Sequence, residues 1–347
     1  MQFTDRLQKN KKTLILLSNL GTPDAPTEEA LRPYLDEFLM DKEVIAAPYP
    51  IRWMIVKLFI LPKRPKESAH AYKTVWTEDG SPLMVYTLKQ IEKLKKIMPE
   101  ADIDFCMRYA NPGMDQAVDK IMKENYEQIL FFPLYPQYAT ATTRSSINQM
   151  EKLLKQANYK GDFCCIEDFC DDEGFIKSLA ENIKDTMAEN NSEHLIMSYH
   201  GVPQSMIKKN DPSGKCLSAG CCDKYQNNHP KCYRAQCFAT SKALQKKLGL
   251  SDDQITVSFQ SRLGPTEWLR PYTDETIEGL AKHGKKRVSI ASPAFVADCI
   301  ETLEELAIQG DESFRENGGE KLSLVPAVND KDDFVAFLAE KIQGVFV

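Results

Sequence analysis

Residues 13–39 read TLILLSNLGTPDAPTEEALRPYLDEFL and contain three successive structural signals. The apolar run at residues 13–18 predicts a short buried strand. Gly21 and Pro23 then interrupt the run, as expected of a tight turn. Thr27 precedes a helical pattern with acidic residues in its first turn, which predicts a helix that begins at Glu28 with Thr27 as its N-cap. A strand, a glycine turn and a helix form the opening of an α/β unit.

The same alternation continues along the chain. Further apolar runs occupy residues 128–132, 194–199, 255–259 and 287–291, and helical patterns occupy residues 90–98, 115–124, 145–155, 176–188 and 332–343. Short buried strands that alternate with helices predict parallel sheets covered on both faces. With 347 residues, the chain is long enough for two such lobes. Ligands of open α/β sheets bind beyond the carboxyl ends of the strands, so the residues there are the candidates for function.

Composition excludes some classes of protein. The net charge of −6 argues against a general nucleic-acid role, since that would need a basic surface. The first residues contain no apolar segment typical of a secretory signal, and the most apolar stretch, residues 53–61, is too short to span a bilayer. We therefore expect a cytoplasmic protein, with peripheral contact at the inner face of the membrane as an option.

His200 ends one apolar run and is followed by Gly201. An imidazole titrates near neutrality and can accept a proton without a permanent charge. Gly201 would let the chain turn sharply beside a ligand. From the residues alone, a catalytic base and a structural histidine at a strand end both stay open.

Asp298 and Glu301 follow another apolar run, and their carboxylates are suited to relaying protons or metal ions. Their spacing equally fits a capping box, with the acidic cap residue three positions before a glutamate. A cap can still face a ligand site, so the two interpretations are compatible.

Several aromatic side chains and one arginine are candidates for a flat ligand with an anionic edge. Arg108 and Tyr109 are adjacent, Tyr135 and Tyr138 share a proline-containing loop, and Trp268 lies in a second loop. Arginine suits a carboxylate partner, and loop aromatics are more suggestive of binding than aromatics within strands. The alternative is that these rings are core residues.

Residues 49–62 form an apolar segment bracketed by prolines, followed by Lys63, Arg64 and Lys66. One interpretation is a buried helix. The other is an apolar lip that enters the membrane interface, with Trp53 and Met54 also available to a hydrophobic ligand and the basic residues meeting lipid phosphates.

Five of the ten cysteines fall close together, at Cys216, Cys221, Cys222, Cys232 and Cys237. Disulfides are improbable in a reducing compartment, and clustered thiolates suit zinc or a 2Fe–2S cluster. The C-x2-C pairs typical of zinc ribbons are missing. We expect four ligands, Cys216, Cys222, Cys232 and Cys237, with Cys221 as a possible substitute.

Seven blocks of this sequence, in order, resemble the ferrochelatase family. They are LLSNLGTPDAPTEEALRPYLDEFLMD, ILPKRPKESAHAYKTVWTEDGSPL, MRYANP, FPLYPQYATATTRSS, SYHGVP, FQSRLGPTEWLRPYTDE and SPAFVADCIETLEEL. Ordered blocks along nearly the whole chain are far more specific than any one motif.

The resemblance implies an α/β fold of two Rossmann-like lobes, each a parallel four-stranded sheet flanked by helices, with an active-site cleft between them. We place the first lobe at residues 1–140 plus a carboxy-terminal helix at 328–347, and the second at residues 141–327, with a cysteine-rich insertion at 213–237. The implied enzyme is a lyase that inserts Fe2+ into protoporphyrin IX to form protohaem, the final step of haem biosynthesis.

The resemblance also implies residue roles. His200 matches the catalytic histidine, Glu301 the catalytic glutamate and Asp298 its acidic neighbour, with His200 and Glu301 also contacting the substrate Fe2+. Arg108, Tyr109, Tyr138 and Trp268 match positions near the porphyrin. Cys299 stands where some members have a second histidine, which argues against a relay role there.

The cysteine-rich insertion resembles that of bacterial members with an internal 2Fe–2S cluster. Cys237 aligns with a cysteine of members that lack a cluster, which favours it as a ligand less than Cys216 or Cys232. Three alternatives for function stay open: coproporphyrin III as the substrate, a chelatase for another tetrapyrrole with cobalt or nickel, and a non-catalytic iron–sulfur or haem sensor.

Overall fold

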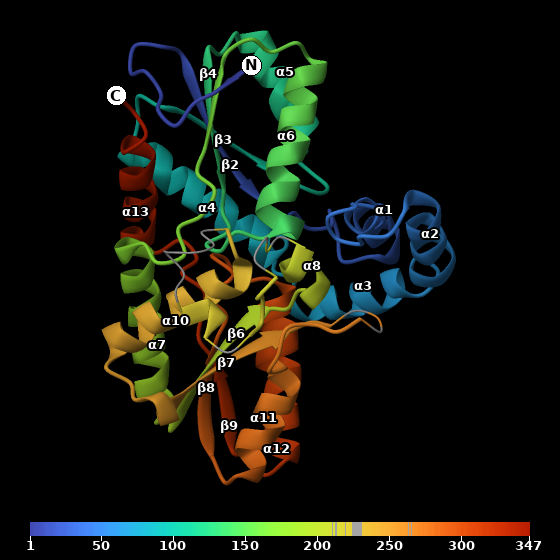
Figure 1. The fold of residues 1–347 in the computed structure, drawn as a ribbon, viewed down its shortest axis with the longest axis vertical. Coiled ribbons are helices and arrows are strands. Elements are labelled where there is room, and N and C mark those ends of the chain that lie inside the picture. The colour runs from blue at the N-terminus through green and yellow to red at the C-terminus, as the bar shows by residue number, and fades with distance from the viewer. Residues whose placement is uncertain (210, 212–213, 219, 224–230, 263, 265) are drawn as a thin grey trace. The chain divides into compact units, whose positions relative to one another are not determined.

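The computed structural model describes residues 1–347 except residues 210, 212–213, 219, 224–230, 263 and 265. The chain divides into two compact units (Figure 1). Unit 1 comprises residues 1–135, 140–168 and 330–347, and unit 2 comprises residues 136–139 and 169–329. No helix in the described part of the chain is long and apolar enough to cross a membrane.

Unit 1 contains a parallel five-stranded sheet with strand order β1-β5-β4-β2-β3. Its elements are β1 (Gln2–Phe3), β2 (Thr13–Asn19), α1 (Glu28–Leu39), α2 (Tyr49–Met54), a π-helix (Ile55–Ile60), α3 (Arg64–Val75), α4 (Pro82–Ile97), β3 (Asp102–Met107), α5 (Met114–Glu124), β4 (Gln128–Pro133), a π-helix (Thr140–Arg144), α6 (Ser145–Gln156), β5 (Asp162–Cys165) and α13 (Asp332–Gln343).

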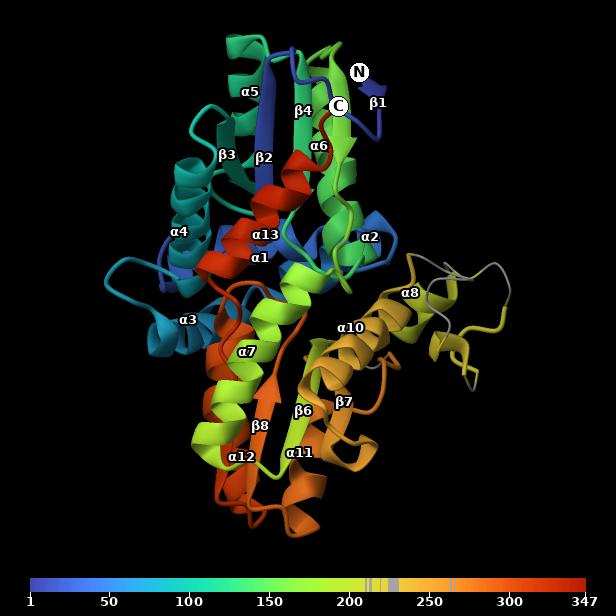
Figure 2. The same cartoon turned by 90° about the vertical axis from the view of Figure 1, so that its left-hand side faces the viewer.

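The opening strand and helix form as their sequence predicts. The Thr27 hydroxyl accepts a hydrogen bond from the Ala30 N–H at 3.3 Å, which confirms the predicted cap. Leu16 of β2 pairs in register with Phe131 of β4, and both side chains belong to the core cluster under α5 and α6. Helices α4 and α13 pack together on the other face of the sheet (Figure 2).

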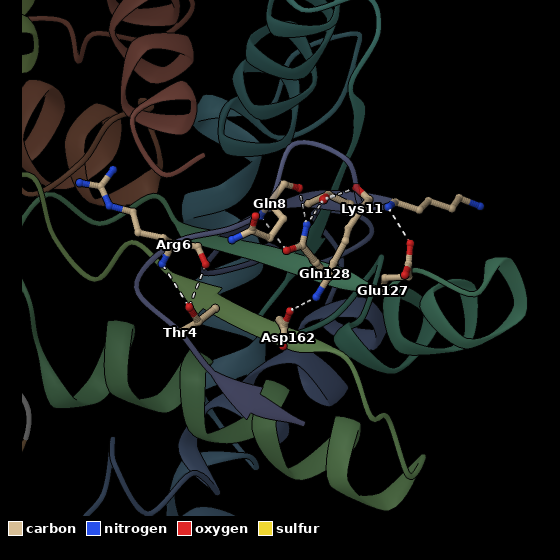
Figure 3. Close-up of polar contacts among 9 residues, drawn as sticks. Thr4, Arg6, Gln8, Lys11, Glu127, Gln128 and Asp162 are labelled. Atoms are coloured by element: carbon tan, nitrogen blue, oxygen red, sulfur yellow. Dashed lines mark hydrogen bonds and ion pairs between the residues drawn. The ribbon is translucent and has the colours of Figure 1, made fainter. Parts of the chain in front are cut away.

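The buried side-chain amide of Gln128 connects the amino-terminal segment to this sheet by hydrogen bonds (Figure 3). The Gln128 side chain exchanges hydrogen bonds of 2.8 Å with both backbone groups of Gln8, and donates another to the Thr13 hydroxyl. Lys11 pairs with Asp162 of β5 at 2.7 Å. These contacts hold the amino-terminal segment near the edge of the sheet, where β1 forms the fifth strand. The prediction of four strands is therefore one strand short in this unit.

Unit 2 contains a parallel four-stranded sheet with strand order β7-β6-β8-β9, as expected. Its elements are α7 (Glu173–Asn190), β6 (His194–His200), α8 (Gln204–Lys209), α10 (Tyr233–Leu248), β7 (Ile255–Gln260), α11 (Thr273–Lys282), β8 (Arg287–Ala291), a π-helix (Glu301–Gly310), α12 (Asp311–Glu316) and β9 (Lys321–Leu324), with 3-10 turns at Cys221–Asp223 and Asp252–Gln254.

Helices cover both faces of this sheet as well. Ile196, Val288 and Ile290 face a core cluster with Ile277 of α11 and Phe314 of α12. Helices α7 and α10 pack against each other on the opposite face (Figure 2). A sheet buried on both sides explains why β6 and β8 read as apolar runs.

The observed division differs from the predicted boundary at residue 140. Residues 140–168 belong to unit 1, because β5 pairs with β4 and α6 covers the same sheet. The short stretch at residues 136–139 belongs to unit 2. Helix α13 belongs to unit 1, where Lys93 of α4 forms an ion pair with Asp332 at 2.8 Å.

Candidate active site

His200 lies at the carboxyl end of β6, where its backbone pairs with Gln260 of β7. Its Nδ1 is 2.7 Å from the Gly201 carbonyl oxygen. Because a carbonyl can only accept, Nδ1 must carry the proton, which leaves the Nε2 lone pair of the neutral ring available. His200 is partly exposed, as a residue that takes a proton from a bound ligand must be.

Close packing in the turn that follows β6 requires a glycine at position 201. A Cβ atom at this position would lie 2.8 Å from the Gln260 carbonyl oxygen and 3.2 Å from the Trp268 ring. The Gly201 N–H donates to that same carbonyl at 2.7 Å. Pro203 and Trp268 form an isolated antiparallel bridge beside the turn. The structure therefore places the partly exposed Trp268 indole against Gly201, in the turn that follows His200.

Glu301 begins the π-helix that follows β8, and its side chain is partly exposed. The Gln260 amide donates to the Glu301 carbonyl at 3.2 Å and accepts from Ser198 of β6 at 2.5 Å. One buried glutamine thus joins the strand that ends in His200 to the turn that presents Glu301. Since β6 and β8 are neighbours in one parallel sheet, the two predicted catalytic residues follow adjacent strands at the same edge.

Asp298 is buried, and its carboxylate accepts three hydrogen bonds. The donors are the Asn329 amide at 2.7 Å, the Thr302 hydroxyl at 3.0 Å and the Ala327 N–H at 3.3 Å. These partners differ from the predicted capping box, in which the carboxylate would accept from the Glu301 N–H. Burial raises the pKa of Asp298, while the bond from Asn329 opposes the shift. Asp298 therefore anchors the turn before Glu301.

Arg108 and Tyr109 lie in unit 1, where Asp41 satisfies both. Arg108 forms an ion pair with Asp41 at 2.5 Å, and the Tyr109 hydroxyl donates to the same carboxylate at 2.9 Å. The Arg108 Nε donates to Ser145 at 2.8 Å. The sequence prediction missed Asp41, although Asp41 is the last residue of the first motif block. Arg108 also lines a cavity of about 510 Å3 in this unit, together with Tyr34.

The two tyrosines of the proline-containing loop differ in their surroundings. Tyr135 is only 7% exposed, against the expectation of an exposed loop aromatic. Tyr138 is partly exposed, its N–H donates to Gln236 of α10 at 2.5 Å, and the Lys231 ammonium lies 5.3 Å from its ring centre. Of this pair, Tyr138 is the one that a ligand can reach directly.

The predicted apolar lip is exposed. Trp53 and Met54 on α2 are 42% and 44% exposed, and the group includes Tyr49, Ile51, Leu58 and Phe59. Arg52 instead turns inward and donates to the carbonyls of Ile45 and Ala47. These exposed apolar side chains argue against the buried-helix interpretation of this segment.

The cysteine-rich insertion is described except for residues 213, 219 and 224–230. The Sγ atoms of Cys221 and Cys222 are 3.7 Å apart, and Arg234 donates to the Cys222 sulfur at 2.8 Å. Burial, together with the neighbouring Cys232 and Cys221, raises the pKa of Cys216 to about 11. Within the described residues, no group of three or more His, Cys, Asp or Glu side chains is arranged to hold a metal ion.

Cys237 differs from the other four cysteines of this group. It lies on α10 with no exposed surface, and burial raises its pKa well above the usual thiol range. Cys221 is partly exposed and is an electrostatic neighbour of Cys216, Cys222 and Cys232. Cys221, predicted only as a possible substitute ligand, therefore interacts electrostatically with three other thiols of the group.

Comparison with known proteins gives the family of the chain. The family model described as Ferrochelatase matches residues 12–345. A ferrochelatase of Pseudomonas syringae pv. tomato is 39% identical over 318 residues, covering 91% of this chain and 93% of its own. A ferrochelatase of Bdellovibrio bacteriovorus is 38% identical over 336 residues, covering 96% and 99%. In structure, the chain is similar to SirB from Bacillus subtilis with Fe3+, with a TM-score of 0.56 at 10% identity, covering 96% of this chain and 95% of that one. The latter likeness concerns the fold alone.

Proposed function

The chain belongs to the ferrochelatase family, and from this premise we propose that it inserts Fe2+ into protoporphyrin IX to form protohaem. The observation that carries the proposal is that Gln260 pairs with His200 in the unit 2 sheet and donates a hydrogen bond to the backbone carbonyl of Glu301. The family assigns the chain to the metal-chelatase lyases. The choice of porphyrin and the roles of single residues are the proposed part.

The reaction replaces two pyrrole N–H protons by one Fe2+ ion. The His200 Nε2 accepts a pyrrole proton, while its Nδ1–H stays on the Gly201 carbonyl and fixes the ring. The resulting imidazolium would be stabilised by a nearby carboxylate. Glu301 supplies that carboxylate, which can take the second proton or bind the incoming metal ion. Asp298 holds the preceding turn through its three hydrogen bonds.

Aromatic side chains of unit 2 supply contacts for a flat macrocycle. Trp268 packs against the turn after His200, and Tyr138 is partly exposed beside α10. Arg108, Tyr109 and Tyr135 are held by partners or by burial in unit 1. We propose that Arg108 and Tyr109 act on the substrate through the structure they stabilise.

The exposed lip supports a contact with membrane lipid. Trp53, Met54, Leu58 and Phe59 present apolar surface, and Lys63 and Arg64 follow immediately in sequence. Protoporphyrin IX partitions into membranes, whereas coproporphyrin III carries more carboxylates and does so less. A lip that meets lipid therefore favours protoporphyrin IX as the substrate.

The test is porphyrin turnover with anionic vesicles present. We expect wild-type protein to metallate protoporphyrin IX faster than coproporphyrin III, with the rate for protoporphyrin IX rising when vesicles are added. Phe59→Glu should remove that rise by opposing insertion, and Phe3→Glu, at an exposed phenylalanine outside the lip, should keep it. Faster metallation of coproporphyrin III would overturn the substrate assignment. An unchanged vesicle effect in Phe59→Glu would overturn the lip.

We further propose that the cysteine-rich insertion holds a 2Fe–2S cluster. Cys216, Cys222, Cys232 and Cys221 offer four soft sulfur donors, and Cys221 contributes to the raised pKa of each of the other three. Cys237 was our expected fourth ligand, but its full burial on α10 supports Cys221 in that place. When bound, the cluster would supply a one-electron centre and a covalent tie across the insertion.

A further inference from the structure

One peptide group next to the proposed base is held at both ends. The peptide that joins His200 to Gly201 donates its N–H to the Gln260 carbonyl at 2.7 Å. Its carbonyl oxygen, that of His200, accepts a hydrogen bond from the Tyr233 hydroxyl at 2.8 Å. The strand partner fixes the nitrogen side, so the Tyr233 hydroxyl is the side-chain group that fixes the oxygen side.

The orientation of this peptide affects the position of the His200 imidazole through one residue, Gly201. The ring Nδ1 of His200 bonds to the carbonyl of Gly201, the next peptide along. Gly201 has no side chain to resist rotation about its backbone bonds. A rotation of the first peptide would therefore move the Gly201 carbonyl, and with it the direction of the Nε2 lone pair.

Tyr233 is placed to hold this peptide firmly. It is 6% exposed and occupies the first position of α10, directly after Cys232. Helix α10 packs on α7 and β7, which fixes the ring relative to the sheet.

We propose that Tyr233 is a positioning residue for His200, acting through the His200–Gly201 peptide. The inference rests on the proposed role of His200 as the base. It adds a part of the machinery that comes from α10 and directly adjoins the cysteine-rich insertion.

Tyr199, the residue before His200 in β6, offers a matched control. The Tyr199 hydroxyl is buried and bonds to Ser241 of α10 at 2.8 Å. Tyr199→Phe and Tyr233→Phe therefore each remove one buried hydroxyl between the same strand and the same helix. Both should lower the thermal midpoint to a similar extent, but only Tyr233→Phe frees the His200 carbonyl.

The experiment combines NMR of 15N-histidine-labelled protein with steady-state kinetics. The signal of His200 among the five histidines is identified by its loss in His200→Gln. At about pH 8, above the ordinary imidazole pKa, the wild type should show the Nδ1–H tautomer. Tyr233→Phe should shift the ring signals toward a tautomer mixture and lower kcat about tenfold with KM nearly unchanged, whereas Tyr199→Phe should change neither.

An unshifted His200 signal in Tyr233→Phe, or an equal shift in Tyr199→Phe, would overturn the proposal. A shifted signal with unchanged kcat would uphold the positioning of the ring and instead contradict the proposed role of His200 as base. Loss of kcat in His200→Gln tests that role independently.

Discussion

The Asp41 carboxylate binds Arg108, Tyr109 and Ser145 in a part of unit 1 where Asp41 is only 7% exposed. Burial alone would raise its pKa. The hydrogen bonds from Ser145 and the Glu43 N–H, together with the charge of Arg108, reverse this and lower the pKa of Asp41. A carboxyl with a lowered folded pKa stabilises the fold above its unfolded pKa, and this contribution is lost as the pH falls through the folded value.

Asp41→Asn should therefore destabilise the protein by about 3 kcal/mol at pH 7, because it leaves Arg108 buried without its counter-charge. The difference from wild type should shrink below about pH 4, as the wild-type carboxyl itself becomes protonated. Urea unfolding at pH 7 and below about pH 4 measures this difference in the free energy of unfolding. The control is Asp36→Asn, which breaks an ion pair with Lys57 whose side chains are 32% and 33% exposed, and which should cost less than about 1 kcal/mol. A difference that stays constant with pH would contradict the account.

Residues of the site differ in how far their sequence reveals them. His200 and Glu301 stand in motifs, and their positions after β6 and β8 follow from the apolar runs before them. Gln260 and Tyr233 act through backbone carbonyls of distant residues. Such contacts depend on which strands and helices become neighbours, and no local pattern encodes them.

At the scale of secondary structure, four of the five strands that the sequence predicts lie inside the sheets, and the fifth is the edge strand β7, whereas the inner strand β5 was not predicted. The runs that became β2, β4, β6 and β8 are apolar because both of their faces are buried. The edge strands β3 and β9 were missed, since exposure lets polar residues such as Asp104 and Ser323 interrupt the pattern. The π-helical form of Glu301–Gly310 has no signal in its composition.

The insertion before α10 is the element whose chemistry the sequence predicts most sharply. Anaerobically purified protein should be reddish-brown, with visible charge-transfer absorption and about two iron and two sulfide per chain. Cys216→Ser, Cys222→Ser, Cys232→Ser and Cys221→Ser should each lose the absorption. Cys237→Ser, at the buried position on α10, is the matched control that should keep it.

Two results would count against this assignment. Colourless protein with stoichiometric zinc would overturn the cluster itself. Loss of colour in Cys237→Ser, with colour retained in Cys221→Ser, would restore Cys237 as the fourth ligand.

At the scale of the whole molecule, the family assignment and the sheet topology independently support an α/β chelatase fold. The family match spans residues 12–345, both units included. Each unit has an all-parallel sheet with helices on both faces. Within unit 2, His200 ends β6, Trp268 follows β7 and Glu301 follows β8, so all three lie beyond or at carboxyl ends of strands, where such sheets bind ligands.

The most direct test of catalysis by His200 and Glu301 is the anaerobic absorption spectrum of protoporphyrin IX with Fe2+ and the Glu301→Gln variant. Wild-type protein should convert the porphyrin spectrum to that of protohaem, and Glu301→Gln should slow the conversion at least about a hundredfold with its fold intact. Glu304→Gln, on the same π-helix but hydrogen-bonded to Gln309, should convert at the wild-type rate. Conversion by Glu301→Gln as fast as by Glu304→Gln would contradict the account.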